Sequence, residues 1–337
     1  MSEKIYCDIL MTNGLDESFY PDVAFSENRA LPLLTDSTNY YMSIVRFSLN
    51  TSTLPVLIPS MKNKDETNYS ITLEYNGVYV QSFIYYSSQS NLAKNHPEYL
   101  YIGNYQYFLY LINNTFNECL NSLKTLVALP ASYTSSPLIN IDMNSKLCYL
   151  EYDSSIYGFN QTGKINIYFN DALGALFSSF PFYIANLSNG RIFQFDIRIN
   201  SFSNNIIQVL SQELSSVGLW NPVASIVFTS NLIPVVASAT PPIQMFKNGY
   251  PITNSSNSNF LNVITDFIGS ELQFTPFVIY NPTAQFRYIE LKPNCEIRNL
   301  DLQVYWLNKN TGAYIPLKLS PGGSCSIKIL FTDKQYL

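Results

Sequence analysis

The sequence has few charged residues. Only 13% of its 337 residues are Asp, Glu, Lys or Arg, whereas a typical soluble domain has about 25%. The formal net charge is −5 and no basic cluster occurs, so nucleic-acid binding through phosphate neutralisation has no electrostatic basis. Low charge combined with 15% aromatic residues favours a surface covered by other protein over an unusually neutral monomer.

Long apolar runs and a disulfide framework are also missing. No run of about 18 or more apolar residues occurs, so we expect no membrane span. The segment from Met1 to Tyr6 has no apolar core, so we expect no secretory signal peptide. The five cysteines are odd in number and widely spaced, which favours reduced thiols in a protein of the cytosol.

Motifs of common catalytic and cofactor sites are absent as well. His96 is the single histidine, and no Gly-x-Ser-x-Gly motif accompanies it, so a solvated loop is favoured over a hydrolase site. Zinc-ligand spacing, a GxGxxG fingerprint and a P-loop do not occur. We therefore expect no enzyme, with no catalytic, cofactor-binding or metal residues.

A glycosidase would need paired carboxylates. Asp196, Glu271 and Glu290 lie on or beside expected strands. Arginines such as Arg198 or Arg287 explain such acids equally well. The many aromatic residues could also stack on sugars, but most lie on expected strand faces, where core packing or subunit contacts are favoured.

The segment from Tyr40 to Pro59 is the expected centre of the fold. Both faces of an extended Tyr40–Asn50 segment are largely apolar, with Arg46 its single charge, which is typical of a strand buried on both sides. The apolar segment that follows carries two prolines, which belong on a sheet edge or a bend. A core strand would thus pass directly into an edge that other chains could contact. The candidate inter-subunit contacts in this edge are Leu54, Val56 and Ile58.

Short strands separated by Pro, Gly and Asn turns occur in both outer parts of the chain. The strands 69–75 and 78–86 flank Asn76-Gly77, which is a type I′ hairpin signal. Other strands are expected at 225–229, 232–237, 262–268, 274–280, 285–291, 300–306, 313–319 and 324–331. Such a series predicts a mainly β protein with a jelly-roll β-sandwich.

The middle of the chain changes period. Apolar residues recur at spacings of three and four from Gly103 to Val127, which predicts an amphipathic helix packed on a sheet. Shorter helices are expected at 172–180, capped by Asp171, and at 204–214, among strands at 139–143, 147–152, 164–169 and 191–199. We therefore expect a jelly-roll domain made of 1–100 and 220–337, with 101–219 as an inserted α+β region. A tandem of two domains is the alternative.

Residues 1–39 hold one expected strand, Lys4 to Met11, followed by polar turns. They are either a loop laid over the core or an N-terminal arm that docks on a neighbouring subunit, since apolar residues in a free arm need a cover. The candidate contacts in this arm are Phe25, Glu27 and Arg29.

Several segments occur in a recognisable order. They are Phe25–Arg29, Tyr41–Leu49, Leu54–Pro59, Asn104–Phe108, Tyr280–Pro282, Phe286-Arg287, Gly312–Leu317 and Ser326–Phe331. In this order, and with gaps over nearly the whole chain, they resemble the penton-type minor capsid proteins of polinton-like viruses, virophages and adintoviruses. The matching motifs are hydrophobic and structural.

The resemblance implies a single jelly roll standing upright at the five-fold vertex of an icosahedral capsid of a double-stranded DNA virus, as a homopentamer. It also implies an outward insertion, contacts with trimers of the major capsid protein, and no catalytic residues. The protein would be made in the host cytoplasm and would reside in the virion.

Two alternatives to the penton are another minor capsid protein of the same lineage and a receptor- or carbohydrate-binding β-sandwich module, such as a spike. The Arg-Gly-Asp attachment triplet of some relatives is absent, so the resemblance does not establish a host receptor as a partner.

Overall fold

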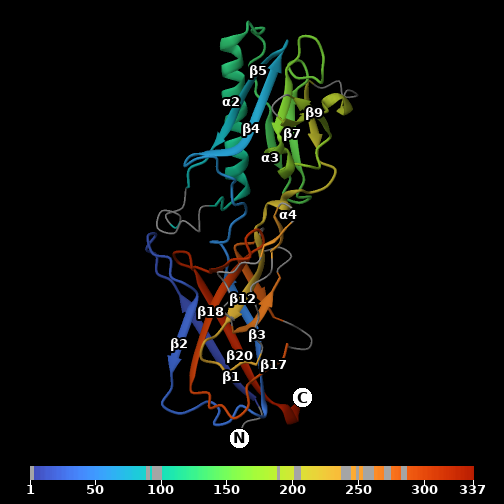
Figure 1. Cartoon of the computed structure of the whole chain (residues 1–337). Helices are drawn as coiled ribbons and strands as arrows, with labels where there is room; N and C mark the ends of the chain where they lie inside the picture. The colour runs from blue at the N-terminus through green and yellow to red at the C-terminus, as the bar shows by residue number, and fades with distance from the viewer. Residues whose placement is uncertain are drawn as a thin grey trace. The chain divides into compact units, whose positions relative to one another are not determined.

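The computed structural model describes residues 4–88, 92, 101–187, 190–200, 206–236, 244–247, 250–252, 262–268, 275–281 and 287–337. Their regular structure is mainly antiparallel strands, and they form two compact units (Figure 1). The first unit contains Leu92 and the described residues of 4–55 and 222–337, and the second contains those of 56–88 and 101–221. The second unit is therefore an insertion in the sequence of the first.

The first unit contains two sheets. One has the order β1 (Lys4–Thr12), β20 (Ser324–Asp333), β3 (Tyr40–Asn50) and β16 (Phe277–Tyr280), with β17 (Ile289–Glu290) also pairing with β3. The other has the order β15 (Val263–Phe267), β12 (Val223–Thr229), β18 (Asn299–Asn308) and β19 (Tyr314–Pro316), with β2 (Ala24–Asn28) also pairing with β18. A short pair, β13 (Gln244–Lys247) and β14 (Tyr250–Ile252), stands apart from both sheets.

The strand order is that of a jelly roll. In chain order the eight main strands are β1, β2, β3, β12, β15, β16, β18 and β20. The sheets β1-β20-β3-β16 and β2-β18-β12-β15 interleave them as two Greek keys do. The predicted jelly-roll sandwich is thus confirmed. In the sequence, the second unit is inserted between the third and fourth strands of the jelly roll.

A β-bulge in β3 explains why both of its faces look apolar in the sequence. The pairing with β20 shifts register at Val45, which has no partner there. Such an extra residue reverses the alternation of side chains. Met42 and Ile44 before the bulge therefore share the core face with Phe47 and Leu49 after it, and all four are at most 4% exposed.

The core lies between the two sheets. The ring of Phe47 on β3 packs against Phe228 of β12 and Phe267 of β15, with centroids 5.2 and 4.7 Å apart. Trp306 of β18 is fully buried as well. Aromatic pairs at such distances add to the gain from burial, so this cluster joins the two sheets.

The second unit combines two sheets with helices. The larger sheet has the order β5 (Val78–Tyr85), β4 (Glu66–Tyr75), β8 (Asn166–Asn170), β10 (Gly190–Phe195) and β9 (Phe182–Leu187). The smaller has the order β11 (Ile207–Ser211), β7 (Cys148–Asp153) and β6 (Leu138–Ile141). The helices are α2 (Tyr105–Leu126), α3 (Asp171–Leu176) and α4 (Val217–Trp220), with 3-10 turns η2 (Ile197–Asn200) here and η4 (Lys334–Tyr336) in the first unit.

Helix α2 confirms the predicted amphipathic helix. It begins after Asn104, whose side-chain oxygen accepts a hydrogen bond from the Tyr107 N–H at 2.7 Å, as an N-cap residue does. Its buried stripe packs on the larger sheet, where Phe116 contacts Phe169 of β8. The helix predicted at 172–180 corresponds to α3, but its N-cap residue is Asn170 rather than Asp171.

The first predicted domain boundary differs from the structure. The hairpin β4–β5 was expected in the jelly roll, but β4 pairs with β8 and both strands pack against α2. The hairpin therefore belongs to the second unit, which starts at 56 and not at 101. Local sequence identified the hairpin well, while its sheet depends on β8, which lies about 90 residues later in the chain.

Two predicted elements near the middle are wrong. The helix expected at 204–214 is replaced, in its described part, by strand β11, which pairs with β7. Its residues alternate, with Ile207 and Val209 exposed and Gln208 and Leu210 buried, and β-branched residues suit a strand. The strand expected at 232–237 is, over its described residues 232–236, a bent segment with one isolated bridge at Val235.

The expected N-terminal arm is instead part of the jelly roll. β1 pairs with β20 over nine residues, and β2 pairs with β18 over five. The segment 4–28 thus supplies an edge strand to each jelly-roll sheet and is neither a free arm nor a covering loop. The partner strands lie more than 270 residues away in the sequence, so local pattern could not reveal them.

Candidate assembly surfaces

The described residues offer no obvious chemical centre. No group of three or more His, Cys, Asp and Glu side chains among them is placed to hold a metal ion. Within the same residues, no helix is both long and apolar enough to cross a membrane. His96 and Glu271 lie outside the described residues.

The two described acids that were considered for catalysis, Asp196 and Glu290, are each paired with a cation. Asp196 accepts hydrogen bonds from Arg198 at 2.6 and 2.7 Å, and these bonds hold the pKa of its carboxyl below the usual range. Glu290 lies 3.7 Å from the Lys334 ammonium. Each acid is thus accounted for by a charge partner rather than by a second carboxylate.

The thiols are free, and four of the five are buried. Burial raises the pKa of Cys119 to about 11 and that of Cys148 and Cys325 to about 12. A nucleophilic cysteine needs a thiolate at neutral pH, so these three side chains act as small apolar groups in the core.

The predicted contacts on β2 share one side of the strand. Phe25, Glu27 and Arg29 are half-buried, while the residues between them are exposed. Glu27 and Arg29 form an ion pair at 3.2 Å. All three side chains therefore keep part of their surface accessible.

The predicted contacts at 54–58 are mostly buried. Leu54 and Val56 are 6% and 5% exposed, and Ile58 is half-buried. Val56 donates its backbone N–H to the carbonyl of Ile102 at 2.9 Å. The side chains of Leu54 and Val56 are therefore core residues of this chain, and only Ile58 keeps substantial access to a partner.

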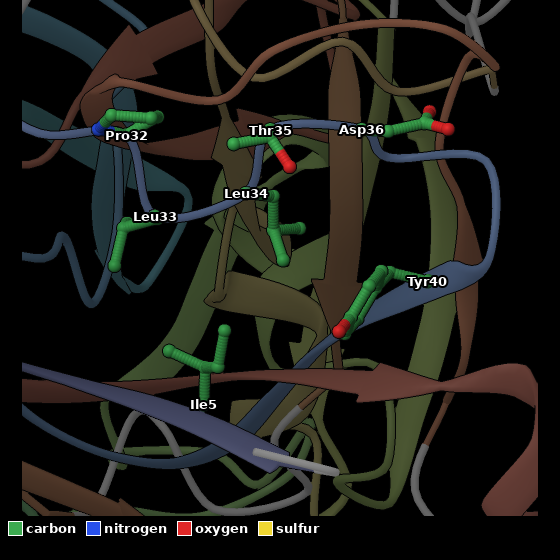
Figure 2. Close-up of a pocket in the computed structure, with 7 residues that line it drawn as sticks. All are labelled: Ile5, Pro32, Leu33, Leu34, Thr35, Asp36 and Tyr40. Carbon is green, nitrogen blue, oxygen red and sulfur yellow. The ribbon is translucent and has the colours of Figure 1, made fainter. Parts of the chain in front are cut away.

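A pocket of about 300 Å³ lies beside β1 and β3. Figure 2 shows Ile5, Leu34 and the hydroxyl of Tyr40 turned toward a common space, with the Asp36 carboxylate turned away from it. A binding site for a polar ligand would need several convergent polar groups. This pocket is therefore an apolar recess of the jelly roll.

The outer face of the sheet β1-β20-β3 carries a small charge cluster. Asp8 lies 3.7 Å from Arg46 and 3.2 Å from Lys328. Around it, Tyr6 and Leu10 are 53% and 72% exposed. The first unit exposes several other large apolar side chains: Leu15, Phe19, Leu31, Phe277, Ile279 and Tyr336. Exposed apolar groups of this kind suit contacts with other protein.

Comparisons with known proteins agree with a capsid fold. The chain matches the family model described as Sputnik minor capsid protein V18/19 over residues 5–333. It is 27% identical to the uncharacterized protein V18 of Sputnik virophage over 152 residues, which are 39% of this chain and 90% of that protein. It is 26% identical to structural protein V19 of the same virophage over 209 residues, which are 58% of this chain and 93% of that protein.

Two solved structures share the fold. A chain of the Sputnik virophage, determined by cryo-EM at 3.5 Å, has a TM-score of 0.78 and 24% identity, covering 100% of this chain and 99% of that one. The SeMet-labelled mavirus penton protein, a crystal structure, has a TM-score of 0.64 and 15% identity, covering 98% and 99%. Since the family model spans nearly the whole sequence, the chain belongs to the Sputnik minor capsid protein V18/19 family and is a structural capsid protein, not an enzyme.

Proposed function

We propose that this minor capsid protein is the penton: a homopentamer at the five-fold vertex that contacts trimers of the major capsid protein. The observation that carries the proposal is the family match over 5–333, joined to a fold shared with the mavirus penton protein over 98% of the chain. The inserted second unit also fits the outward insertion of penton-type proteins.

A ring of five requires two different complementary surfaces on each subunit, because its interfaces are heterologous. The jelly roll has two unlike outer faces. One carries the cluster of Asp8, Arg46 and Lys328. The other exposes parts of Tyr305 and Leu307 of β18. Unlike faces on opposite sides of one sandwich support a ring over a two-fold dimer.

The low charge supports assembly energetically. An interface of standard size, about 1,600 Å², gives on the order of 40 kcal/mol of gross hydrophobic gain at about 25 cal/mol per Å², and ordering and desolvation remove most of it. Because an interface with few charged groups loses little free energy to charge desolvation, a larger share of the hydrophobic gain remains. Of the predicted contacts, Phe25, Glu27, Arg29 and Ile58 retain the exposure that a subunit contact needs.

Light scattering on the purified protein tests the oligomer. We expect a mass five times the chain mass of 38.3 kDa. Leu10→Glu, on the outer face of β1, should reduce that mass, while Leu126→Glu at the end of α2, similarly exposed at 65%, serves as the control. A monomer at all concentrations that never enters particles would contradict the proposal.

Cryo-EM tests the position in the capsid. Particles whose protein carries a fused fluorescent protein after Leu337 should show added density near the five-fold vertices alone. Added density at other lattice positions would indicate another minor capsid protein of the same lineage.

A further inference from the structure

We propose that the outer face of the β4–β5 hairpin binds a neutral oligosaccharide. We call this surface the hairpin face and define it by Tyr79, Gln81, Phe83 and Tyr85 of β5 with Thr72 of β4, while the buried Ser70 lies beneath it. The hairpin lies at one edge of the larger sheet of the second unit, with α2 beside it (Figure 1).

The aromatic residues of the hairpin face are not core residues. Along β5 the alternate residues Val80 and Ile84 are buried, at 8% and 0% exposure, and pack inward. Tyr79 and Tyr85 point the other way and are 50% and 63% exposed. Because alternate residues of a strand lie about 6.8 Å apart, these two tyrosines stand about 20 Å apart along β5, a span that suits an extended chain of sugar rings.

Polar groups with fixed orientation lie between the rings. Gln81 is exposed, and its side-chain N–H donates to the Ser70 hydroxyl at 2.8 Å. This bond orients the amide and leaves its oxygen for a ligand. Thr72 pairs with Gln81 across the hairpin and is half-buried beside it. Orientation by a neighbouring strand is the preorganisation that a binding site requires.

The end of the hairpin face near the turn is rigid. The ring of Tyr79 lies 6.2 Å from that of Tyr168 on β8. Its cross-strand neighbour Glu74 is buried, and its carboxylate accepts hydrogen bonds from the Gly77 N–H and the Asn166 amide. These bonds satisfy both carboxylate oxygens and hold the turn in place, while the remaining negative charge disfavours an acidic ligand at this end.

The charges at the other end cancel. The Lys62 ammonium lies 3.9 Å from the centre of the Phe83 ring and 3.2 Å from a carboxylate oxygen of Glu66. A balanced pair attracts neither an acidic nor a basic ligand over any distance. Electrostatics on this face therefore favour a neutral partner.

The chemistry distinguishes a sugar from a protein partner. The central part of a protein interface is more apolar than the rest of the surface, whereas the rings here are separated by the Gln81 amide and the Thr72 hydroxyl. Sugar rings present apolar C–H faces edged by hydroxyls, so they match isolated aromatic platforms with hydrogen-bonding groups between them. We infer an oligosaccharide, and treat a second copy pairing along the outer edge of β5, which pairs with no other described strand, as an outcome of the test.

The test uses the full-length protein in its native oligomeric form. An array of immobilised neutral and acidic oligosaccharides is probed first, and the retained sugar is then titrated by calorimetry. We expect retention of a neutral oligosaccharide that is insensitive to salt. Tyr79→Ala and Tyr85→Ala should each weaken binding about tenfold, the effect of losing one stacking contact. Tyr110→Ala, an equally exposed tyrosine of α2 at 58%, should leave binding unchanged.

Several results would overturn the inference. These are the absence of any retained neutral oligosaccharide, an equal loss of binding in Tyr110→Ala, and a fall in the light-scattering mass of Tyr79→Ala, which would show a protein contact instead. Sugar binding by a monomeric protein would defeat the pentamer while leaving this site intact, so the two proposals fail separately.

Discussion

The two units of this chain build β-rich cores from different kinds of contact. In the first unit the central strand β20 lies between β1 and β3, and Lys4 pairs with Thr332. In the second, adjacent strands such as β4–β5 and β6–β7 are hairpin neighbours, and one long helix covers a sheet. Since non-local pairing slows folding, the jelly roll depends on the whole chain, whereas the insertion can form from its own segment.

Core truncation in each unit gives the largest expected effect. Phe47→Ala and Phe169→Ala remove rings that are 2% and 0% exposed, and each should lower the free energy of unfolding of its own unit by about 3–5 kcal/mol. Trp306 and Trp220 are buried reporters, one in each unit. Denaturant curves of single-tryptophan variants, each keeping one reporter, measure the two transitions.

The variant that keeps only Trp220 requires Trp306→Phe, and this substitution should disturb the first unit little. The buried indole N–H of Trp306 has no hydrogen-bond partner among the described residues, so Trp306→Phe loses no hydrogen bond. If Phe47→Ala shifts both unfolding transitions equally, the two units unfold as one, and the conclusion that each unit has a core of its own is wrong.

A smaller effect is expected where the second unit is tightly packed. A Cβ added at Gly174 of α3 would lie 2.2 Å from a ring carbon of Phe193. Gly174→Ala should therefore cost about 1–3 kcal/mol of unfolding free energy through overpacking, read from the Trp220 transition. Gly218→Ala in α4, where nothing lies within 4 Å, is the matched control and should be neutral or slightly stabilising. Equal losses in both variants would contradict the packing explanation.

The smallest effect is expected at the Asp196–Arg198 pair. Its bonds lower the pKa of Asp196 below 3.8 in the folded state, so its stabilisation is present above the unfolded pKa and is lost as pH falls through the folded value. Asp196→Asn should lower the unfolding free energy by less than about 1 kcal/mol at pH 7. The difference from the unsubstituted protein should begin to shrink as the pH falls below 3.8 and should vanish only below the lower, folded pKa. A difference that grows on acidification would refute the assignment.

Local pattern was sufficient for elements whose partners are close in sequence. The hairpin at Asn76-Gly77 and helix α2 appear where their turn signal and three-to-four spacing place them. The local pattern around Pro55 also predicted a sheet edge, but it did not predict that the side chains of Leu54 and Val56 would be buried. Burial of those two side chains depends on segments far along the chain, and no local pattern encodes that.

By itself, the sequence determined the mainly β character, the long helix and the shortage of charge, because alternation, turn residues and composition are local properties. The tertiary structure alone decided that β1 and β2 are sheet edges, that Ile207–Ser211 is a strand, and that Val45 reverses the phase of β3. Each of these depends on hydrogen bonds to a strand distant in sequence. A segment's own residues set its preferences, but its partner sets its register and its final form.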